Sequence, residues 1–263
     1  MRALVMGVLN VTPDSFSDGG RYLDPDAAVA HGRRLVAEGA DVVDVGGEST
    51  RPGAEPVSID EEIRRVEPVV AALAGEVRVS VDTRHAPVAE AAVAAGATLI
   101  NDVSAGLHET AGRLGVGWVA MHMQGEPGTM QDDPHYDDVV AEVRRFLVGR
   151  AEAAAAAGVE EVWIDPGYGF GKTFEHNLEL LAHVDELVAT GWPVVVGTSR
   201  KSTLGRLLAE SDGSPEPPPV EDRLEASLAT ATWAMAHGAG MIRAHDVRAT
   251  ALAAHVVQGD DTR

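Results

Sequence analysis

The segment VRVSVDTRHAPVAEAAVAAGATLIND, residues 77–102, contains the repeating unit on which the fold prediction rests. Its apolar run 77–81 predicts a buried strand, Ala86–Ala95 predicts a helix, and Gly96 predicts the turn into a second strand at 98–100. A strand and a helix followed by another strand, with no hairpin turn between them, indicates two parallel strands joined by a crossover.

Apolar runs of this kind recur along the whole chain. The expected strands are 4–9, 42–45, 77–81, 98–100, 118–121, 162–164, 194–196 and 241–242. Eight strands alternating with helices favour a closed (β/α)8 TIM barrel, which typically takes about 250 residues. We expect residues 1–263 to form one such α/β domain, because no Pro/Gly/Ser-rich linker divides them. The alternative is an open, doubly wound sheet, which would place its site at one switch point in the strand order.

The segments between these runs carry apolar residues at helical spacing. The expected helices are 27–38, 86–95, 138–157, 174–190, 221–237 and 246–257, with a further helix after the capping box at 58–61. In a capping box, a serine side chain accepts a hydrogen bond from the backbone three residues later. The proline-rich stretch Ser211–Val220 cannot continue a helix, so we expect a surface loop there.

The composition excludes several classes of protein. A net charge of −20 argues against partners such as nucleic acid or an anionic membrane surface. The chain has no cysteine, which rules out disulfides, thiol catalysis and zinc sites built from thiolates. No apolar stretch approaches the ~20 residues of a membrane span, and Met1 leads directly into a strand rather than into a signal peptide. We therefore expect a cytoplasmic protein that binds small molecules.

A polar or charged group follows every apolar run, and in a barrel these groups would all meet at one end. They are Asn10, Glu48, Asp82, Asn101, Asp102, His122, Gln124, Asp165, Ser199, Lys201, Arg243 and His245. Asp44 stands inside its run and is expected at the same end of the barrel. Eight loops that build a single polar site indicate an enzyme.

Asp82 and Asn101 follow neighbouring strands and combine a carboxylate with an amide. Together they can bind both the donors and the acceptors on the edge of a heterocycle. Each could instead cap a helix, since Asp and Asn favour that position. Near the fifth strand, Met121 is expected in the core and Met123 facing the site.

Cationic side chains gather in the loops after the second, seventh and eighth strands, although the chain as a whole is acidic. Arg51 either binds an anion or is a solvated surface arginine. Arg200 and Lys201 precede a helix, whose N-terminus favours anions, and Arg243 and His245 follow the last strand. This pattern predicts a phosphate or diphosphate ligand, with Mg²⁺ held by oxygen ligands and by the phosphates themselves.

The run DPGYGFGKT, residues 165–173, is a glycine-rich loop after the sixth strand. It is not a phosphate-binding P-loop, because Pro166 stands where that motif requires glycine. The only lysines of the chain are Lys172 and Lys201, both at strand ends. A chain that otherwise uses arginine is expected to need at least one of them. For the segment His122–Gln124 the sequence predicts no role.

Eight segments together resemble the dihydropteroate synthases of folate biosynthesis. They are NVTPDSFSDGG (10–20), DVGGESTRPGAEPV (44–57), VSVDT (79–83), INDVSAG (100–106), MHMQGEPGTMQ (121–131), DPGYGFGKT (165–173), GTSRKS (197–202) and RAHDV (243–247). The resemblance covers essentially the whole chain, in order, with one motif in each barrel loop. Each motif alone is weak, but the ordered set is specific. The family often has glycine where this chain has Ala105 and valine where it has Ala244.

The resemblance implies a Mg²⁺-dependent, homodimeric, pterin-binding transferase. Such an enzyme condenses a 7,8-dihydropterin bearing a 6-hydroxymethyl diphosphate with p-aminobenzoate and releases diphosphate. Sulfonamides compete for the p-aminobenzoate pocket in this family. We expect an SN1-like path, in which the loops 10–20 and 47–56 order around the diphosphate and Asp14 approaches the developing cation.

By matching motif, the resemblance also assigns residues to each ligand. The pterin would be bound by Asp82, Asn101, Val103, Met123, Asp165, Gly197, Lys201 and Arg243. The diphosphate would be bound by Asn10, Arg51, Ser199, Arg243 and His245, and Asn10 would also ligate the metal. The p-aminobenzoate would be bound by Phe16, Thr50, Pro52, Phe170, Lys201 and Ser202. The residues expected to carry catalysis are Asp14, Arg51, Lys201, Arg243 and His245.

Two other functions use the same barrel. A pterin-dependent methyltransferase domain would share the acids that bind the pterin but would not need the phosphate-binding cations. A non-catalytic paralogue would bind pterin yet should have lost residues in the diphosphate and Mg²⁺ loops. Here Asn10, Asp14, Arg51, Lys201 and His245 are all present, which favours an active synthase.

Overall fold

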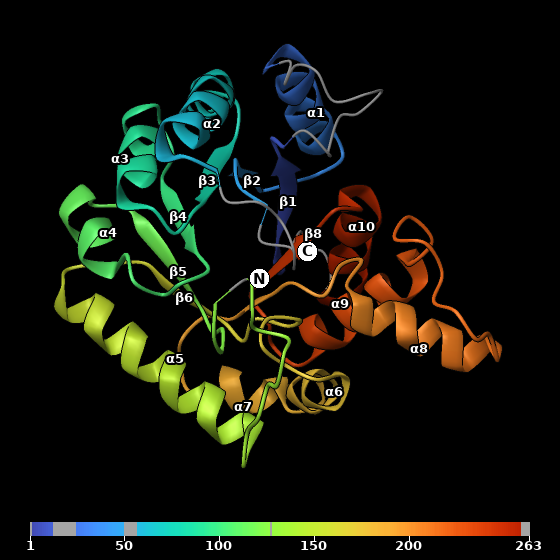
Figure 1. The fold of residues 1–263 in the computed structure, drawn as a ribbon. Helices are drawn as coiled ribbons and strands as arrows, with labels where there is room; N and C mark the ends of the chain where they lie inside the picture. The colour runs from blue at the N-terminus through green and yellow to red at the C-terminus, as the bar shows by residue number, and fades with distance from the viewer. Residues whose placement is uncertain (1, 13–24, 50–56, 127, 259–263) are drawn as a thin grey trace.

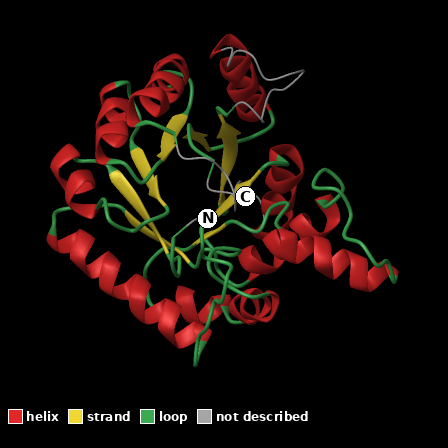
Figure 2. Cartoon of the chain, in the orientation of Figure 1, coloured by secondary structure: helices red, strands yellow, loops and turns green. Residues whose placement is uncertain are grey.

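The computed structural model describes residues 2–12, 25–49, 57–126 and 128–258. Within them, eight strands alternate with helices that surround them (Figures 1 and 2). The strands are β1 (Leu4–Asn10), β2 (Val42–Gly46), β3 (Arg78–Asp82), β4 (Leu99–Asp102), β5 (Gly117–Met121), β6 (Val162–Asp165), β7 (Val195–Val196) and β8 (Met241–Ala244). Each lies within two residues of its expected position.

The helices of the described residues cover the outer face of the strands (Figure 2). They are α1 (Pro25–Ala37), α2 (Ile59–Leu73), α3 (Ala86–Ala94), α4 (His108–Leu114), α5 (Val139–Ala156), α6 (Phe174–Ala182), α7 (Val184–Val188), α8 (Ser202–Asp212), α9 (Leu224–Ala236) and α10 (Val247–Gln258). One half of the predicted capping box is confirmed: Ser58 Oγ accepts from Glu61 N at 3.3 Å, while the Glu61 carboxylate accepts from Arg64 and Arg65. None of these helices is long and apolar enough to cross a membrane.

The strands form one parallel sheet in the order β6-β5-β4-β3-β2-β1-β8-β7. The two ends of this sheet meet, because Ile164 of β6 pairs with Val194 just before β7, and Ile164 N donates to Pro193 O at 3.0 Å. The predicted (β/α)8 barrel is therefore confirmed, and the open doubly wound alternative is wrong.

Successive side chains of each strand point alternately into the barrel interior and toward the helices, as they must in parallel strands buried on both faces. In β2, Val42 belongs to the interior cluster and Val43 to the cluster between strands and helices. The interior cluster comprises Met6, Val42, Leu99, Val119, Trp163, Val195 and Met241, with Leu4 packed against it. This apolar layer is the platform above which the polar strand ends stand.

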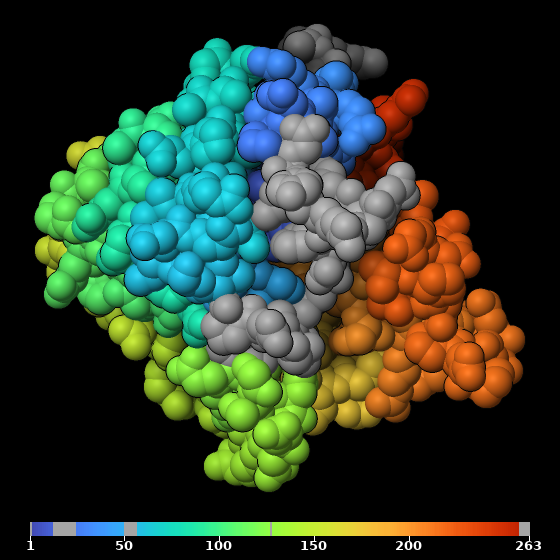
Figure 3. All heavy atoms as spheres, turned by 45° about the horizontal axis from the view of Figure 1, so that its top comes forward, coloured from blue at the N-terminus to red at the C-terminus, as the bar shows by residue number. Residues whose placement is uncertain are grey.

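Two details differ from the expected helices. The stretch 174–190, predicted as one helix, is two: α6 ends and α7 begins around His183, whose φ of −111° is not helical. The helix α4 was not predicted, because it has only seven residues and contains Gly112. The predicted loop at 211–220 does connect two helices, and with α8 it projects from the edge of the molecule (Figure 3, orange).

Candidate active site

The carboxyl ends of the first four strands bring three of the expected residues to one level of the barrel. Asn10 pairs with Gly46, Gly46 with Asp82, and Asp82 with Asn101 across β1 to β4. A Cβ placed on Gly46 would lie 3.4 Å from Asp82 Cβ and 3.6 Å from Asn10 Oδ1. Because position 46 has no side chain, the space between the Asn10 amide and the Asp82 carboxylate stays open.

Arg243, on β8, forms hydrogen bonds with carboxylates of β2 and β3. Its Nε donates to Asp44 Oδ2 and its Nη2 donates to Asp82 Oδ2, both at 2.7 Å. Asn101 Nδ2 donates to the same Asp44 oxygen at 2.9 Å. Asp82 and Asn101 are therefore not helix caps: the N-cap of α3 is His85 and that of α4 is Leu107.

The charges of this network are strongly coupled. Burial raises the pKa of Asp82 to about 7, with Arg243 opposing and Asp44 adding to that rise. Burial acts to lower the pKa of Arg243, but Asp44 and Asp82 outweigh it and raise that pKa above its ordinary value. The guanidinium thus stays charged, while Asp82 can gain or lose a proton near neutral pH.

A second group lies at the ends of β6 and β7. Asp165 is buried, and its Oδ1 accepts from Gly167 N at 2.7 Å. Lys201 donates to the carbonyl of Tyr168, and its Nζ lies 4.4 Å from the centre of the Phe170 ring. Burial raises the pKa of Asp165, and burial lowers the pKa of Lys201 to about 8; each of these two charges opposes the shift of the other.

The third group joins the ends of β7 and β8. Ser199 Oγ is 3.1 Å from His245 Nδ1 and accepts from His245 N at 3.1 Å. Arg200, which the sequence groups with the cations of this mouth, is paired within the protein. Its guanidinium forms two hydrogen bonds with Asp246, at 2.6 and 3.0 Å, so that charge is already compensated.

The other expected residues are placed as follows. Val103 is buried, Met121 is buried as expected for the core, and Met123 is half-buried. Gly197 faces Arg243 and Asp165, since a Cβ there would lie 3.7 Å from Arg243 Cβ and 3.9 Å from Asp165 Oδ2. Ser202 is the exposed first residue of α8. The residues Asp14, Phe16, Thr50, Arg51 and Pro52 lie outside the described part of the chain.

Comparison with known proteins agrees with this architecture. Residues 6–245 match the family described as "Pterin binding enzyme". The chain is 51% identical to the dihydropteroate synthase of Mycobacterium leprae, over 96% of this chain and 92% of that protein. The chain belongs to the dihydropteroate synthase family.

Solved structures of this family also resemble the chain in sequence and in fold. A Xanthomonas albilineans dihydropteroate synthase with 4-aminobenzoic acid has a TM-score of 0.88 and 49% identity, covering 98% of this chain and 92% of that chain. A structure of the enzyme from the same organism in complex with 7,8-dihydropteroate has a TM-score of 0.85 and 46% identity, covering 98% and 93%.

Family membership makes two positions of this chain instructive. Asp44 was expected at the barrel mouth but was given no ligand from the sequence, although it is fully buried and accepts from both Arg243 and Asn101. The available signal was a carboxylate inside an apolar strand, two residues from inward-facing Val42. Ala105 has a φ of 51°, a left-handed conformation that glycine adopts more easily, which gives a physical reason for the glycine that the family often has there.

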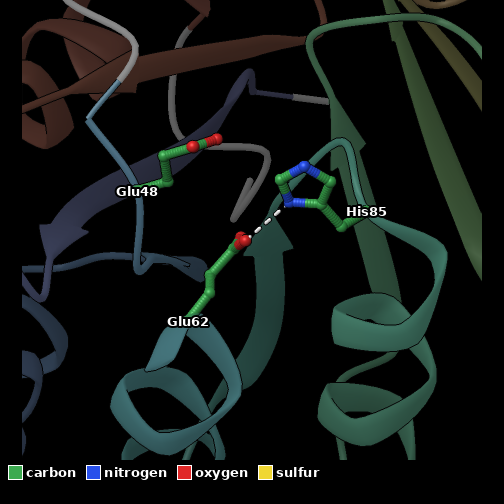
Figure 4. A group of neighbouring side chains, drawn as sticks. All are labelled: Glu48, Glu62 and His85. Carbon is green, nitrogen blue, oxygen red and sulfur yellow. Dashed lines mark hydrogen bonds and ion pairs between the residues drawn. The ribbon is translucent and has the colours of Figure 1, made fainter. Parts of the chain in front are cut away.

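A group that could hold a divalent ion lies beside the β2 and β3 ends. The ligand atoms of Glu48, Glu62 and His85 lie within 4.8 Å of one another (Figure 4). Two carboxylates and an imidazole suit a transition metal better than Mg²⁺. Their atoms also have protein partners: Glu62 binds His85 Nδ1 and Thr83 Oγ1, both at 2.7 Å, and Glu48 binds Arg84 at 3.3 Å. These side chains therefore already form a hydrogen-bonded network with neighbouring groups of the protein.

Proposed function

We infer that this chain is a transferase that condenses 6-hydroxymethyl-7,8-dihydropterin diphosphate with p-aminobenzoate. The methylene C–O bond to diphosphate breaks, a C–N bond to the arylamine forms, and the amine nitrogen then loses a proton to solvent. The observation that carries this inference is the hydrogen-bonded network of Arg243, Asp44, Asp82 and Asn101 at the barrel mouth, in which Asp44 and Asn101 are buried. It supplies an acceptor and donor set for a heterocycle in a chain of the dihydropteroate synthase family.

The pterin is proposed to lie on this network, between Asp82 on one side of the barrel mouth and Asp165 on the other. Asp82, Asn101 and Asp165 would hydrogen-bond its edges, Lys201 would donate to it, and the Arg243 plane would stack on its ring. The open space at Gly197, between Arg243 and Asp165, supports this placement. The side chains expected to complete the pterin subsite are Val103 and Met123.

The diphosphate is proposed to lie toward β1, β7 and β8. Asn10, Ser199, Arg243 and His245 would contact it, together with Arg51. The amide oxygen of Asn10 is a hard ligand, and the space above Gly46 is open beside it, so these residues fit Mg²⁺ bound jointly with the diphosphate. When bound, Mg²⁺ would stabilise negative charge on the leaving group.

The arylamine is proposed to lie beside Phe170 and Lys201, which contact each other. Its carboxylate would approach Ser202 at the start of α8, where backbone N–H groups favour an anion. Phe16, Thr50 and Pro52 are expected to complete this pocket, and sulfonamides are expected to compete for it.

The chemistry follows from the charged groups at the barrel mouth. Developing positive charge on the pterin methylene would be stabilised by the carboxylates of buried Asp165 and partly exposed Asp82, with Asp14 expected to approach in the loop 10–20. Positively charged Arg243 and the expected donors Arg51 and His245 would stabilise charge on the departing diphosphate. The arylamine is a neutral nucleophile, so no strong base and no covalent enzyme intermediate are needed. Lys201 is expected to contribute as a charged donor.

We also propose a cytoplasmic homodimer built from one domain over residues 1–263. The support for a dimer is apolar surface on the late helices: Trp233 is 46% exposed on α9, and Leu252 and Val256 are 59% and 84% exposed on α10. Elements α9 and α10 pack against each other, so these side chains can belong to one surface.

The deciding experiment is a diphosphate-release assay with purified protein, the pterin diphosphate, Mg²⁺ and p-aminobenzoate. We expect release that depends on p-aminobenzoate, with dihydropteroate formed in equal amount. If release does not depend on p-aminobenzoate, the proposal is wrong. Calorimetric titration with the pterin would then separate a non-catalytic pterin-binding protein from a barrel that binds none.

A further inference from the structure

The glycine-rich loop between β6 and α6 is held by side chains at every successive carbonyl from 167 to 171. Gly167 O and Phe170 O accept from Lys172 Nζ at 3.1 and 3.0 Å, Tyr168 O accepts from Lys201 Nζ, Gly169 O accepts from Gln131 Nε2 at 2.7 Å, and Gly171 O accepts from Tyr136 Oη at 2.7 Å. Both lysines of the chain therefore serve this one loop. A loop fixed in this way has little freedom to move relative to its surroundings.

Lys172 is the central contact, because its amine also reaches the end of β5. Its Nζ lies 2.9 Å from His122 Nδ1 and 3.3 Å from His122 O. Only 3% of Lys172 is exposed, so no solvent replaces these contacts. Burial lowers the pKa of His122 to about 3, and nearby Lys172 adds to that shift. The ring is therefore neutral, and its Nδ1 can accept from the amine.

The two loops also approach each other backbone to backbone. A Cβ on Gly167 would lie 1.9 Å from His122 O, and a Cβ on Gly171 would lie 2.3 Å from Gln124 O. Both glycines have left-handed φ values, 68° and 58°. A compact amine can reach several carbonyls at such a contact, whereas the planar fork of an arginine is suited to paired acceptors in one plane.

The position of this loop decides where Phe170 lies. Phe170 contributes its carbonyl to Lys172 and its ring to the contact with Lys201 Nζ. Lys201 in turn is bonded to Tyr168 of the same loop. Releasing the Lys172 amine would leave Gly167 O and Phe170 O without that donor, and the loop would shift to reach other donors.

We propose that Lys172 is a positioning residue for the arylamine substrate, holding the loop 166–171 on the His122–Gln124 segment so that Phe170 and Lys201 face p-aminobenzoate. The proposal rests on the proposed function, and it gives the end of β5 the role that the sequence did not reveal. Lys172 does not touch the reacting atoms; it acts through Phe170 and Lys201.

The test compares Lys172→Met with wild type in steady-state kinetics and in hydrogen exchange. We expect KM for p-aminobenzoate to rise about tenfold, and the affinity for the pterin, measured by calorimetry, to fall by a smaller factor, because Phe170 is assigned to the arylamine alone and Lys201 to both ligands. Amide exchange of the peptide 166–171 should accelerate about tenfold, because its anchoring bonds are lost. A folded Lys172→Met protein with wild-type KM and wild-type exchange would overturn the proposal.

Two matched comparisons separate positioning from loss of stability. His122→Asn can keep a hydrogen-bond acceptor for Lys172 at the position of His122 Nδ1, whereas His122→Phe removes that acceptor. Only His122→Phe should therefore raise KM for p-aminobenzoate. This pair decides the matter if Lys172→Met is not recovered folded. Leu73→Ala, in the core at the far end of α2, should lower stability without changing KM; an equal rise of KM there would also overturn the proposal. Absence of wild-type turnover would count against the proposed function, while the exchange measurement would still decide whether Lys172 anchors the loop.

Discussion

The two ends of the barrel each hold arginine–carboxylate pairs, but in opposite surroundings. At the amino end, Arg78 pairs with Glu161 at 2.6 Å, and both side chains are partly exposed, at 29% and 39%. At the carboxyl end, Arg243 pairs with Asp44 and Asp82 at 2.7 Å, and Asp44 is fully buried. An exposed ion pair contributes little to stability, whereas a buried ion pair holds charged groups at a place that solvent does not reach. The carboxyl end therefore concentrates charge for function, and the apolar layer beneath it provides stability.

The largest effect should come from Arg243→Met. This substitution leaves buried Asp44 and partly buried Asp82 without their cation and removes the proposed pterin and diphosphate contact. We expect kcat/KM to fall at least about 10³-fold, comparable to or larger than the loss of a key charge-stabilising donor. Steady-state kinetics would measure it, with Arg78→Met as the matched arginine at the opposite end. Similar losses in the two variants would show that the distinction between the ends is wrong.

The core of the amino end should show the reverse pattern. Leu73 is fully buried at the end of α2, and Leu73→Ala should lower the free energy of unfolding by about 3 kcal/mol. Because Leu73 takes no part in the proposed site, kcat/KM below the melting transition should be unchanged. Urea denaturation and kinetics on the same preparation would measure both quantities. A loss of kcat/KM without a loss of stability would contradict this division.

The pH dependence should sharpen the contrast. The pKa of Asp82 is raised to about 7 and that of Lys201 is lowered to about 8. Below pH 7, Asp82 gains a proton and loses acceptor capacity, and above pH 8, Lys201 loses its charge. We expect kcat/KM to be greatest between these values and to fall by up to about tenfold for each pH unit outside them.

Protonation of Asp82 should affect stability in the direction opposite to its effect on activity. The pKa of Asp82 lies above its ordinary 3.8 in the folded protein, so the folded state holds a proton that the unfolded state releases. Stability contributed by this group is therefore present at low pH and lost as pH rises from about 4 to about 7. Asp82→Asn should remove the acidic limb of the activity profile and should stabilise the fold at pH 8 more than at pH 4. Equal effects at the two pH values would contradict the raised pKa.

Much of this arrangement could be predicted from the sequence, because short-range patterns determine it. The eight strands follow from apolar runs, and the convergence of Asp82, Asn101 and Asn10 follows from parallel pairing. The pairing of Arg200 with Asp246 could not be predicted, since it joins residues in different loops that only the closed barrel brings together. The same is true of Lys172 and His122, which are 50 positions apart in the chain. Register and loop geometry decide such contacts, and neither is visible as periodicity.

The smallest effect should come from Arg78→Met at the amino end. Arg78 makes two hydrogen bonds to Glu161, at 2.6 and 2.9 Å, yet Glu161 also accepts from Trp163 Nε1 at 2.7 Å and remains accessible to water. We expect a loss of about 1 kcal/mol in the free energy of unfolding, the upper range for a partly exposed pair, with kcat/KM unchanged.

The pH dependence of that loss provides its check. Burial acts to raise the pKa of Glu161, but hydrogen bonds from Arg78 and Trp163 outweigh it, and the net shift is downward. A lowered folded-state pKa gives stability that is present at neutral pH and lost as pH falls through the acid range. The difference in unfolding free energy between Arg78→Met and wild type, measured by urea denaturation, should therefore shrink on acidification. A difference that stays constant down to the acid transition would show that Arg78 acts through the packing of its aliphatic stem rather than through its charge.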